Sequence, residues 1–257
     1  MNHLIHQAAL ENMQGASYLE ARDEKQALVS FNNALEYMSQ AASNYYCTKL
    51  IEQVAAATST VSAVPQQAVA QPEPTNNSNN SPIPLMAIPK PHDSENDSDM
   101  DMEHFKPDND SADQNPKHFV YCQALVFNPA VARSPVDSLF YSAVVIFNTA
   151  LCFHNGGAKI DPCSDSKAAS LYDICLELLR ESATRFNCSH IIISAMNNKA
   201  CVHMSMNDYT NANTVLDQLL SVVLSQKGSP AAFSENDING ILHNILLLKS
   251  GCISPAA

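Results

Sequence analysis

Apolar residues recur at spacings of three and four along most of the chain, the pattern of an amphipathic helix. In the first segment, one helix face collects Ala27, Phe31, Ala34, Met38 and Ala41. An earlier helix over residues 4–19 is expected to pair with it, turning near residues 22–24, and the second helix is expected to continue toward Val54. Because a lone helical pair leaves an apolar face uncovered, this hairpin is expected to pack on the later helices.

The same periodicity returns in the second half of the chain. It predicts five further helices, at residues 136–154, 166–182, 190–206, 208–225 and 235–249. Ser234 is a candidate N-cap for the last of these, which has a single apolar stripe typical of a terminal capping helix. Before them, residues 118–127 form a β-prone run that ends at Asn128-Pro129. With no evident strand partner, this run is expected to be an extended strap packed on helices.

Between the two helical parts the composition changes sharply. Residues 65–116 hold nine of the 14 prolines, and nine acidic residues against one lysine fall between Asp93 and Asp113. Such a stretch cannot bury enough apolar surface to offset its ordering entropy, so disorder is expected. The predicted organisation is a helical hairpin at 1–61, a disordered linker at 62–117, an extended strap at 118–135, and two further hairpins with a capping helix at 136–257.

Charge and composition narrow the function classes. The formal net charge of −12 is a poor match for nucleic acid, where Lys and Arg supply most of the affinity, and we expect no nucleic-acid partner. Six glycines disfavour glycine-rich phosphate loops and dinucleotide-binding fingerprints. The N-terminus lacks the pattern of a signal peptide, and no run approaches the ~18 apolar residues of a membrane span. The eight scattered cysteines form no Cys-x-x-Cys pair, so a cytoplasmic or nuclear location and no membrane partner are expected.

Small residues recur at a fixed spacing. Gly15 is followed at +3 by Tyr18, at +12 by Ala27, at +16 by Phe31 and at +19 by Ala34. A second copy starts at Ala200, and a third starts at Ala150 with its second-helix residues arriving late, after a loop at 155–165. Small side chains let paired helices approach closely, and larger ones fill the space beyond. The residues of this spacing are Gly15, Tyr18, Ala27, Phe31, Ala34, Asn148, Ala150, Ala168, Tyr172, Asn198, Ala200, Tyr209 and Ala212.

This spacing resembles the tetratricopeptide repeat (TPR), a helix–turn–helix unit. The chain is also similar to an expanded algal (diatom-type) family of TPR-like proteins. This similarity rests on residues 146–151, His154, Tyr172 and the pair at 197–198. The resemblance implies an all-α fold of antiparallel helical hairpins stacked as an irregular TPR-like solenoid. It further implies that first helices line a concave groove that binds a partner, with Asn12, Leu19, Glu20, His154, Asn155, Asn197, Met204 and Ser205 as groove residues.

The function expected from these features is a non-enzymatic scaffold or adaptor that binds a peptide or protein in the groove. The chain lacks Gly-x-Ser-x-Gly, phosphate-loop and His-Glu-x-x-His motifs, so no catalytic residue and no cofactor are expected. Cys152 and His154 do not have zinc-ligand spacing, and no metal site is expected. Ser94 and Ser98, each with aspartate three residues later, are possible phosphorylation sites. The alternative is a small-molecule- or metal-responsive regulator using the same groove, and the oligomeric state stays open.

Overall fold

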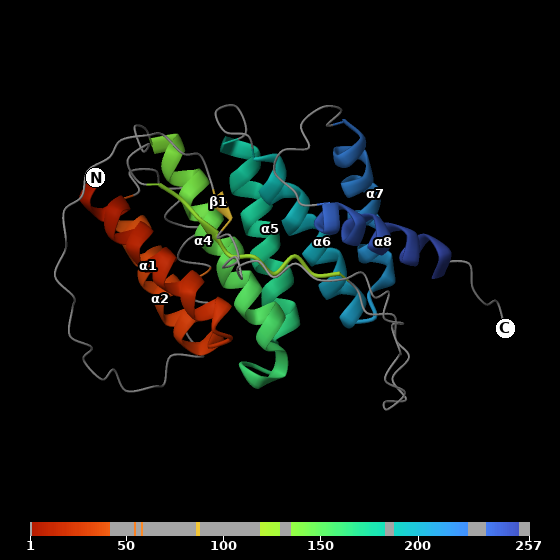
Figure 1. Ribbon diagram of the computed structural model, residues 1–257, viewed down its shortest axis with the longest axis horizontal. Helices are drawn as coiled ribbons and strands as arrows, with labels where there is room; N and C mark the ends of the chain where they lie inside the picture. The colour runs from red at the N-terminus through yellow and green to blue at the C-terminus, as the bar shows by residue number, and fades with distance from the viewer. Residues whose placement is uncertain are drawn as a thin grey trace, which may run out of the picture.

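The computed structural model describes residues 2–41, 54, 58, 86–87, 119–128, 135–182, 188–225 and 235–251. Most of these residues are helical, which confirms the all-α class (Figure 1). The expected disordered linker and the continuation of the second helix past Ala41 lie almost wholly outside the described residues, as do Ser94 and Ser98. The helices are α1 (Asn2–Glu20), α2 (Glu24–Ala41), α4 (Pro135–Gly156), α5 (Ser164–Ser182), α6 (Ser189–Ser205), α7 (Tyr209–Ser225) and α8 (Glu235–Gly251), with a short 3-10 helix at Gly157–Lys159.

Neighbouring helices pack in chain order. α1 lies on α2, α2 on α4, α4 on α5, α5 on α6 and α6 on α7, so that a row of helices results (Figure 1). The contact between α2 and α4 confirms that the first hairpin packs on the later helices. One large apolar core joins α1, α2, α4 and α5 with Ile191, Ala195 and Val202 of α6, and a smaller core joins other residues of α6 to α7 and α8.

Two tight turns close their hairpins in the same way. Arg22 and Asn207 both have a φ of 59°, a left-handed conformation that reverses the chain after α1 and after α6. The next residue is aspartate in both cases, and it caps the following helix: Asp23 accepts a hydrogen bond from the Gln26 N–H, and Asp208 accepts one from the Asn211 N–H. Local sequence therefore sets both turns.

The predicted repeat residues are buried with two exceptions. Tyr18 is only partly buried, and Tyr209 is 53% exposed, so the expectation that Tyr209 packs at a helix contact is wrong. Tyr209 is the first residue of α7, and its hydroxyl donates to Asn207 Oδ1 in the preceding turn.

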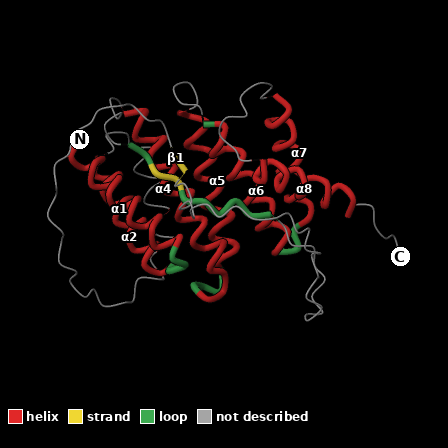
Figure 2. Tube along the Cα trace, viewed as in Figure 1, coloured by secondary structure: helices red, strands yellow, loops and turns green. Residues whose placement is uncertain are grey.

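Residues 119–128, for which the name strap is kept, run as an extended segment across the helices (Figure 2). Within the strap, β2 (Leu125–Val126) pairs antiparallel with β1 (Met86–Ala87), Met86 opposite Val126 and Ala87 opposite Leu125. The strap contacts both cores: Tyr121, Ala124, Leu125 and Phe127 belong to the large one, and Phe119 and Val120 pack against the small one. It therefore spans the row of helices from α1 at one end to α8 at the other.

One helical stretch, Asp137–Lys159, is long and apolar enough to cross a membrane by length and composition alone. Its most apolar window is 89% buried inside the protein, as in the core helix of a globular fold. No clear membrane-spanning segment is therefore found among the described residues.

Candidate functional site

Four helices that lie along the strap each direct asparagine side chains at it. These five residues, the asparagine row, have no exposed surface: Asn12 on α1, Asn148 on α4, Asn197 and Asn198 on α6, and Asn244 on α8. A buried primary amide is costly unless its donors and acceptor are all paired. The hydrogen-bond partners of the asparagine row therefore define the candidate site.

At one end of the row, two asparagines hold Leu125. The Leu125 N–H donates to Asn148 Oδ1 at 2.9 Å, and Asn148 Nδ2 donates back to the Leu125 carbonyl at 2.7 Å. Asn12 Nδ2 donates to the same carbonyl at 2.9 Å, and Asn148 Nδ2 also donates to Asn12 Oδ1 at 2.8 Å. Both backbone groups of Leu125 are thus satisfied by side chains from α1 and α4.

The same arrangement recurs toward the other end. The Tyr121 N–H donates to Asn198 Oδ1 at 2.8 Å, and Asn198 Nδ2 donates to the Tyr121 carbonyl at 2.9 Å. The Phe119 N–H donates to Asn244 Oδ1 at 2.8 Å, and Asn244 Nδ2 donates to the Phe119 carbonyl at 2.7 Å. Asn197 Nδ2 adds a second bond to that carbonyl at 3.0 Å.

These pairs fix the direction and register of the strap. Residues 119, 121 and 125 have the same parity, and in an extended chain such residues turn their backbone groups to the same side. Because Phe119 lies at α8, Tyr121 at α6 and Leu125 at α4 and α1, the strap runs opposite to the order of the helices. Each group of asparagines thus bonds to the backbone of one particular residue of the extended strap.

Side chains of the strap fill the spaces between these bonds. The Tyr121 ring lies edge-on to His190 with centroids 5.2 Å apart and 6.3 Å from the Phe147 centroid, and burial raises the pKa of its hydroxyl above the usual value. Phe127 stacks on Tyr141 at 4.4 Å. Leu125 is fully buried. Apolar and aromatic side chains of the strap therefore pack against the helices beside the backbone hydrogen bonds.

A glycine on α8 makes the seat for Phe119. A methyl group added at Gly240 would overlap the Phe119 ring, so only glycine allows the ring to lie flat on this helix. Neither Gly240 nor Asn244 is a sequence-predicted site residue. The available signal is a polar residue, Asn244, inside the apolar stripe that contains Ile241 and Ile245.

The predicted groove residues divide into three sets. Asn12 and Asn197 lie on the strap-facing side, where they are buried beneath the chain's own backbone and bonded to it. Leu19 and Met204 are buried in the two cores, because apolar residues at helical spacing pack inward. The third set comprises Glu20, Asn155 and Ser205, which are exposed, and His154, which is partly buried.

His154 is an internal residue, with Nδ1 3.4 Å from the Tyr172 hydroxyl. Burial lowers the pKa of His154 to about 4, and the nearby Asp165 opposes this shift only in part. The imidazole is therefore neutral at pH 7. The Tyr172 hydroxyl also accepts a hydrogen bond from Asn198 Nδ2 at 3.2 Å, so His154 is connected to the asparagine row through a single residue.

We expect acid to destabilise the protein in a window set by this histidine. The pKa of His154 is about 4 in the folded state against 6.5 in the unfolded chain, so the unfolded state binds more protons between these values. The contribution of this group to the free energy of unfolding should therefore be fully present above pH 6.5 and fall by about 3 kcal/mol by pH 4. Urea unfolding of wild type and His154→Gln at a series of pH values measures the difference.

The expected result is a shallower pH dependence in the glutamine variant. Some slope should remain, because burial lowers the pKa of His190 as well. Identical slopes in the two proteins would contradict the assignment, since carboxylates contribute equally to both.

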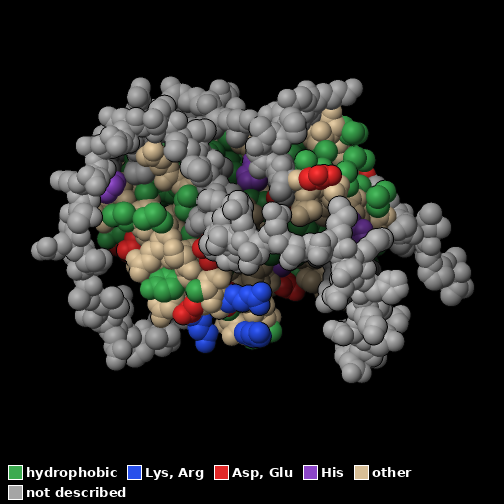
Figure 3. Space-filling model, viewed as in Figure 1, with side chains coloured by type: hydrophobic (Ala, Val, Ile, Leu, Met, Phe, Trp, Pro, Cys, Tyr) green, Lys and Arg blue, Asp and Glu red, His purple; other side chains and the backbone are tan. Residues whose placement is uncertain are grey.

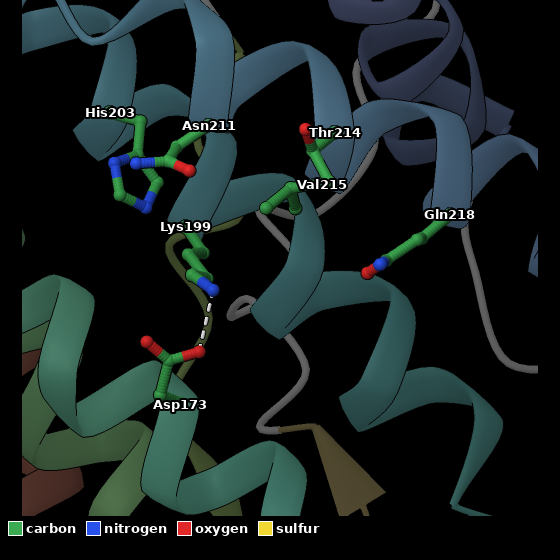
Figure 4. A pocket seen from close by; sticks show the side chains of 7 residues that line it. All are labelled: Asp173, Lys199, His203, Asn211, Thr214, Val215 and Gln218. Carbon is green, nitrogen blue, oxygen red and sulfur yellow. Dashed lines mark hydrogen bonds and ion pairs between the residues drawn. The ribbon is translucent and has the colours of Figure 1, made fainter.

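A separate cavity of about 240 Å³ lies among α5, α6 and α7 (Figure 4). At its wall the Lys199 ammonium contacts the Asp173 carboxylate at 2.5 Å, and His203 Nδ1 lies 3.2 Å from Asp208 Oδ2. The lining residues are Asp173, Lys199, His203, Asn211, Thr214, Val215 and Gln218. Hydrogen bonds from Asn211 hold the pKa of Asp208 below its usual value. Within the described part of the chain, no three His, Cys, Asp or Glu side chains are grouped to hold a metal ion.

No family model, no curated protein and no solved structure matches this chain. The site that its own geometry defines is the asparagine row with the strap it holds.

Proposed function

We propose that this protein is a TPR-like, non-enzymatic adaptor that binds an extended polypeptide segment along the asparagine row. The observation that carries the proposal is the paired recognition of residues 119, 121 and 125. In each pair, one side-chain amide accepts from the N–H and donates to the carbonyl of the same residue. A buried amide needs hydrogen-bond partners, and the extended backbone of the strap supplies them here.

The TPR-like part of the proposal is supported by the packing of successive helices and by the two equivalent turns. Each helix from α1 to α7 packs on the next described one, as in a one-dimensional repeat array. Arg22-Asp23 and Asn207-Asp208 close the first and last hairpins with the same conformation and the same cap. The asparagines that hold the strap come from α1, α4, α6 and α8 and from none of the alternate helices α2, α5 and α7.

The contacts favour a peptide recognised by its backbone and its apolar side chains. Hydrogen bonds from the amides to a peptide backbone do not depend on the side chains of the peptide, so they would contribute affinity for any extended sequence. Sequence preference would come from the apolar contacts made where Tyr121, Leu125 and Phe127 now lie. The bonds from the row to the strap join neutral groups throughout. On the face drawn in Figure 3, the visible basic side chains lie together in the lower middle of the view.

A nicked protein tests this function. Protease sites introduced within 107–116 and within 129–134 would leave the strap bound without covalent attachment. We expect a fluorescent peptide of residues 118–128 to exchange into the nicked protein and to be displaced by its unlabelled form, measured by anisotropy. A peptide of the same composition in scrambled order is the control. Loss of the strap without rebinding of the peptide, in a protein that stays helical, would contradict peptide binding by the row.

The small-molecule alternative is distinguished by the same preparation. A ligand-responsive regulator would show a ligand-dependent shift in melting temperature with no peptide exchange. The cavity among α5, α6 and α7 is smaller than the roughly 300–1,000 Å³ of most ligand sites, and its lysine and histidine already face carboxylates. Peptide binding is therefore the function that the described contacts support better.

A further inference from the structure

The two ends of the strap are held unequally. Tyr121 and Leu125 are 1% and 0% exposed and belong to the large core, whereas Phe119 and Val120 are only partly buried; Val120 packs against the small core, and Phe119 packs against the edge of both. The backbone at Phe119 depends on Asn244 and Asn197, near the end of the row of helices. Opening over residues 119–121 would therefore take one buried side chain, Tyr121, out of the large core and leave Leu125 and Phe127 packed there.

The chain connections act in the same direction. Only residues 129–134 connect the strap to α4, so its C-terminal end cannot move far from the groove. The nearest described residues before its N-terminal end are Met86 and Ala87, which pair with β2, so residues 88–118 separate Phe119 from that anchor. The connectivity therefore restrains the N-terminal end of the strap less than its C-terminal end.

The groove also has a polar group that the strap leaves unused. Ser194 lies between His190 and Asn198 at i+4 spacing on α6, the face that contacts Tyr121. Its buried hydroxyl has no hydrogen-bond partner among the residues that the structure describes. An unpaired buried hydroxyl is costly, so an occupant that supplied a partner for it would fit this part of the groove better than the strap does.

We infer that residues 119–121 are an exchangeable occupant of the groove over α6 and α8, which a partner protein displaces with its own extended segment. The partner segment is a strand with the pattern aromatic–any residue–aromatic, running from α8 toward α6. Its first aromatic ring lies on Gly240, and its backbone pairs with Asn244 and Asn198. This inference rests on the proposed function and adds which part of the strap leaves, the direction of the partner and its first recognition element.

Two variants loosen the same end of the strap but differ in what they leave behind. Phe119→Ala removes the ring from its seat and keeps Asn244 and Gly240 available. Asn244→Ala removes the clamp itself. Both should speed hydrogen exchange of the Tyr121 amide by at least tenfold, with exchange of the Leu125 amide unchanged. Asn236→Ala, an exposed position on the same helix, is the matched control and should behave as wild type.

The probe is a fluorescent peptide of residues 117–122 with Cys122→Ser, titrated into each full-length protein. We expect weak binding to wild type, at least tenfold tighter binding to Phe119→Ala, and no binding to Asn244→Ala. Circular dichroism and melting temperature establish that each variant is folded. If Phe119→Ala destabilises the fold, Phe119→Leu provides the same comparison with a smaller loss of packing.

Equal affinity of Phe119→Ala and wild type for the peptide would overturn the inference. Equal affinity of Phe119→Ala and Asn244→Ala would overturn it too, as would hydrogen exchange in which the Tyr121 amide opens only together with the Leu125 amide. These outcomes are distinguishable from failure of the proposed function. If the nicked protein exchanges the whole strap peptide but the intact chain does not open at Phe119, the proposed function stands and the inference of an exchangeable N-terminal end fails.

Discussion

Replacement of Asn148 with alanine is expected to lower the free energy of unfolding by about 3–5 kcal/mol. The substitution removes three hydrogen bonds inside the core and leaves the Leu125 N–H and Asn12 Oδ1 without the partners they have now. Each buried polar group left unpaired costs about 1–3 kcal/mol, and the vacated volume adds to the loss. Urea unfolding followed by circular dichroism measures the change.

Two further variants make this test specific. Asn155→Ala changes an exposed amide on the same helix and should alter stability by less than about 0.5 kcal/mol. Asn148→Asp keeps an acceptor for the Leu125 N–H but places a carboxylate against the Leu125 carbonyl, so it should be at least as damaging as alanine. A loss below about 1 kcal/mol in Asn148→Ala would mean that the strap contributes little to holding α1 and α4 together.

The helices were predictable because their signal is local. Spacings of three and four place each helix within a few residues of its observed bounds; the expected 190–206 is observed as Ser189–Ser205. The first and last turns could also be anticipated, since an aspartate cap and a left-handed residue act over four positions. Propensity and amphipathic pattern are sufficient wherever a structure is determined by near neighbours in sequence.

The asparagine row was only partly predictable. Repeat spacing singled out Asn148 and Asn198, and resemblance singled out Asn12 and Asn197, but nothing local indicates that their amides meet the chain's own backbone. The partners are separated by 23 residues at Leu125 and Asn148 and by 125 at Phe119 and Asn244. The periodic pattern of apolar residues along the sequence does not indicate contacts between residues so far apart in the chain. A backbone acceptor also has no sequence signature of its own, so an occupied groove and an open one look alike in sequence.

Replacement of Gly15 with alanine tests the close contact between α1 and α2. We expect it to lower the free energy of unfolding, whereas helix propensity alone would raise it. Alanine in the middle of an exposed helix stabilises by about 1 kcal/mol relative to glycine. At Gly15 the added methyl group would overlap the Phe31 ring, which has no exposed surface. Overpacking of this kind destabilises, so Gly15→Ala should lower the free energy of unfolding by about 2–3 kcal/mol.

A double-mutant cycle identifies the cause. Phe31→Leu removes the ring atoms that the new methyl group would meet and alone should cost about 1–2 kcal/mol through lost packing. In the double variant the two losses should be less than additive by at least 1 kcal/mol, because the leucine makes room for the alanine. Gln14→Ala, the neighbouring exposed position on α1, is the control for propensity alone. Additive losses would place the strain of Gly15→Ala elsewhere than against Phe31, and a stabilised Gly15→Ala would show that α1 and α2 do not approach as closely as the structure has them.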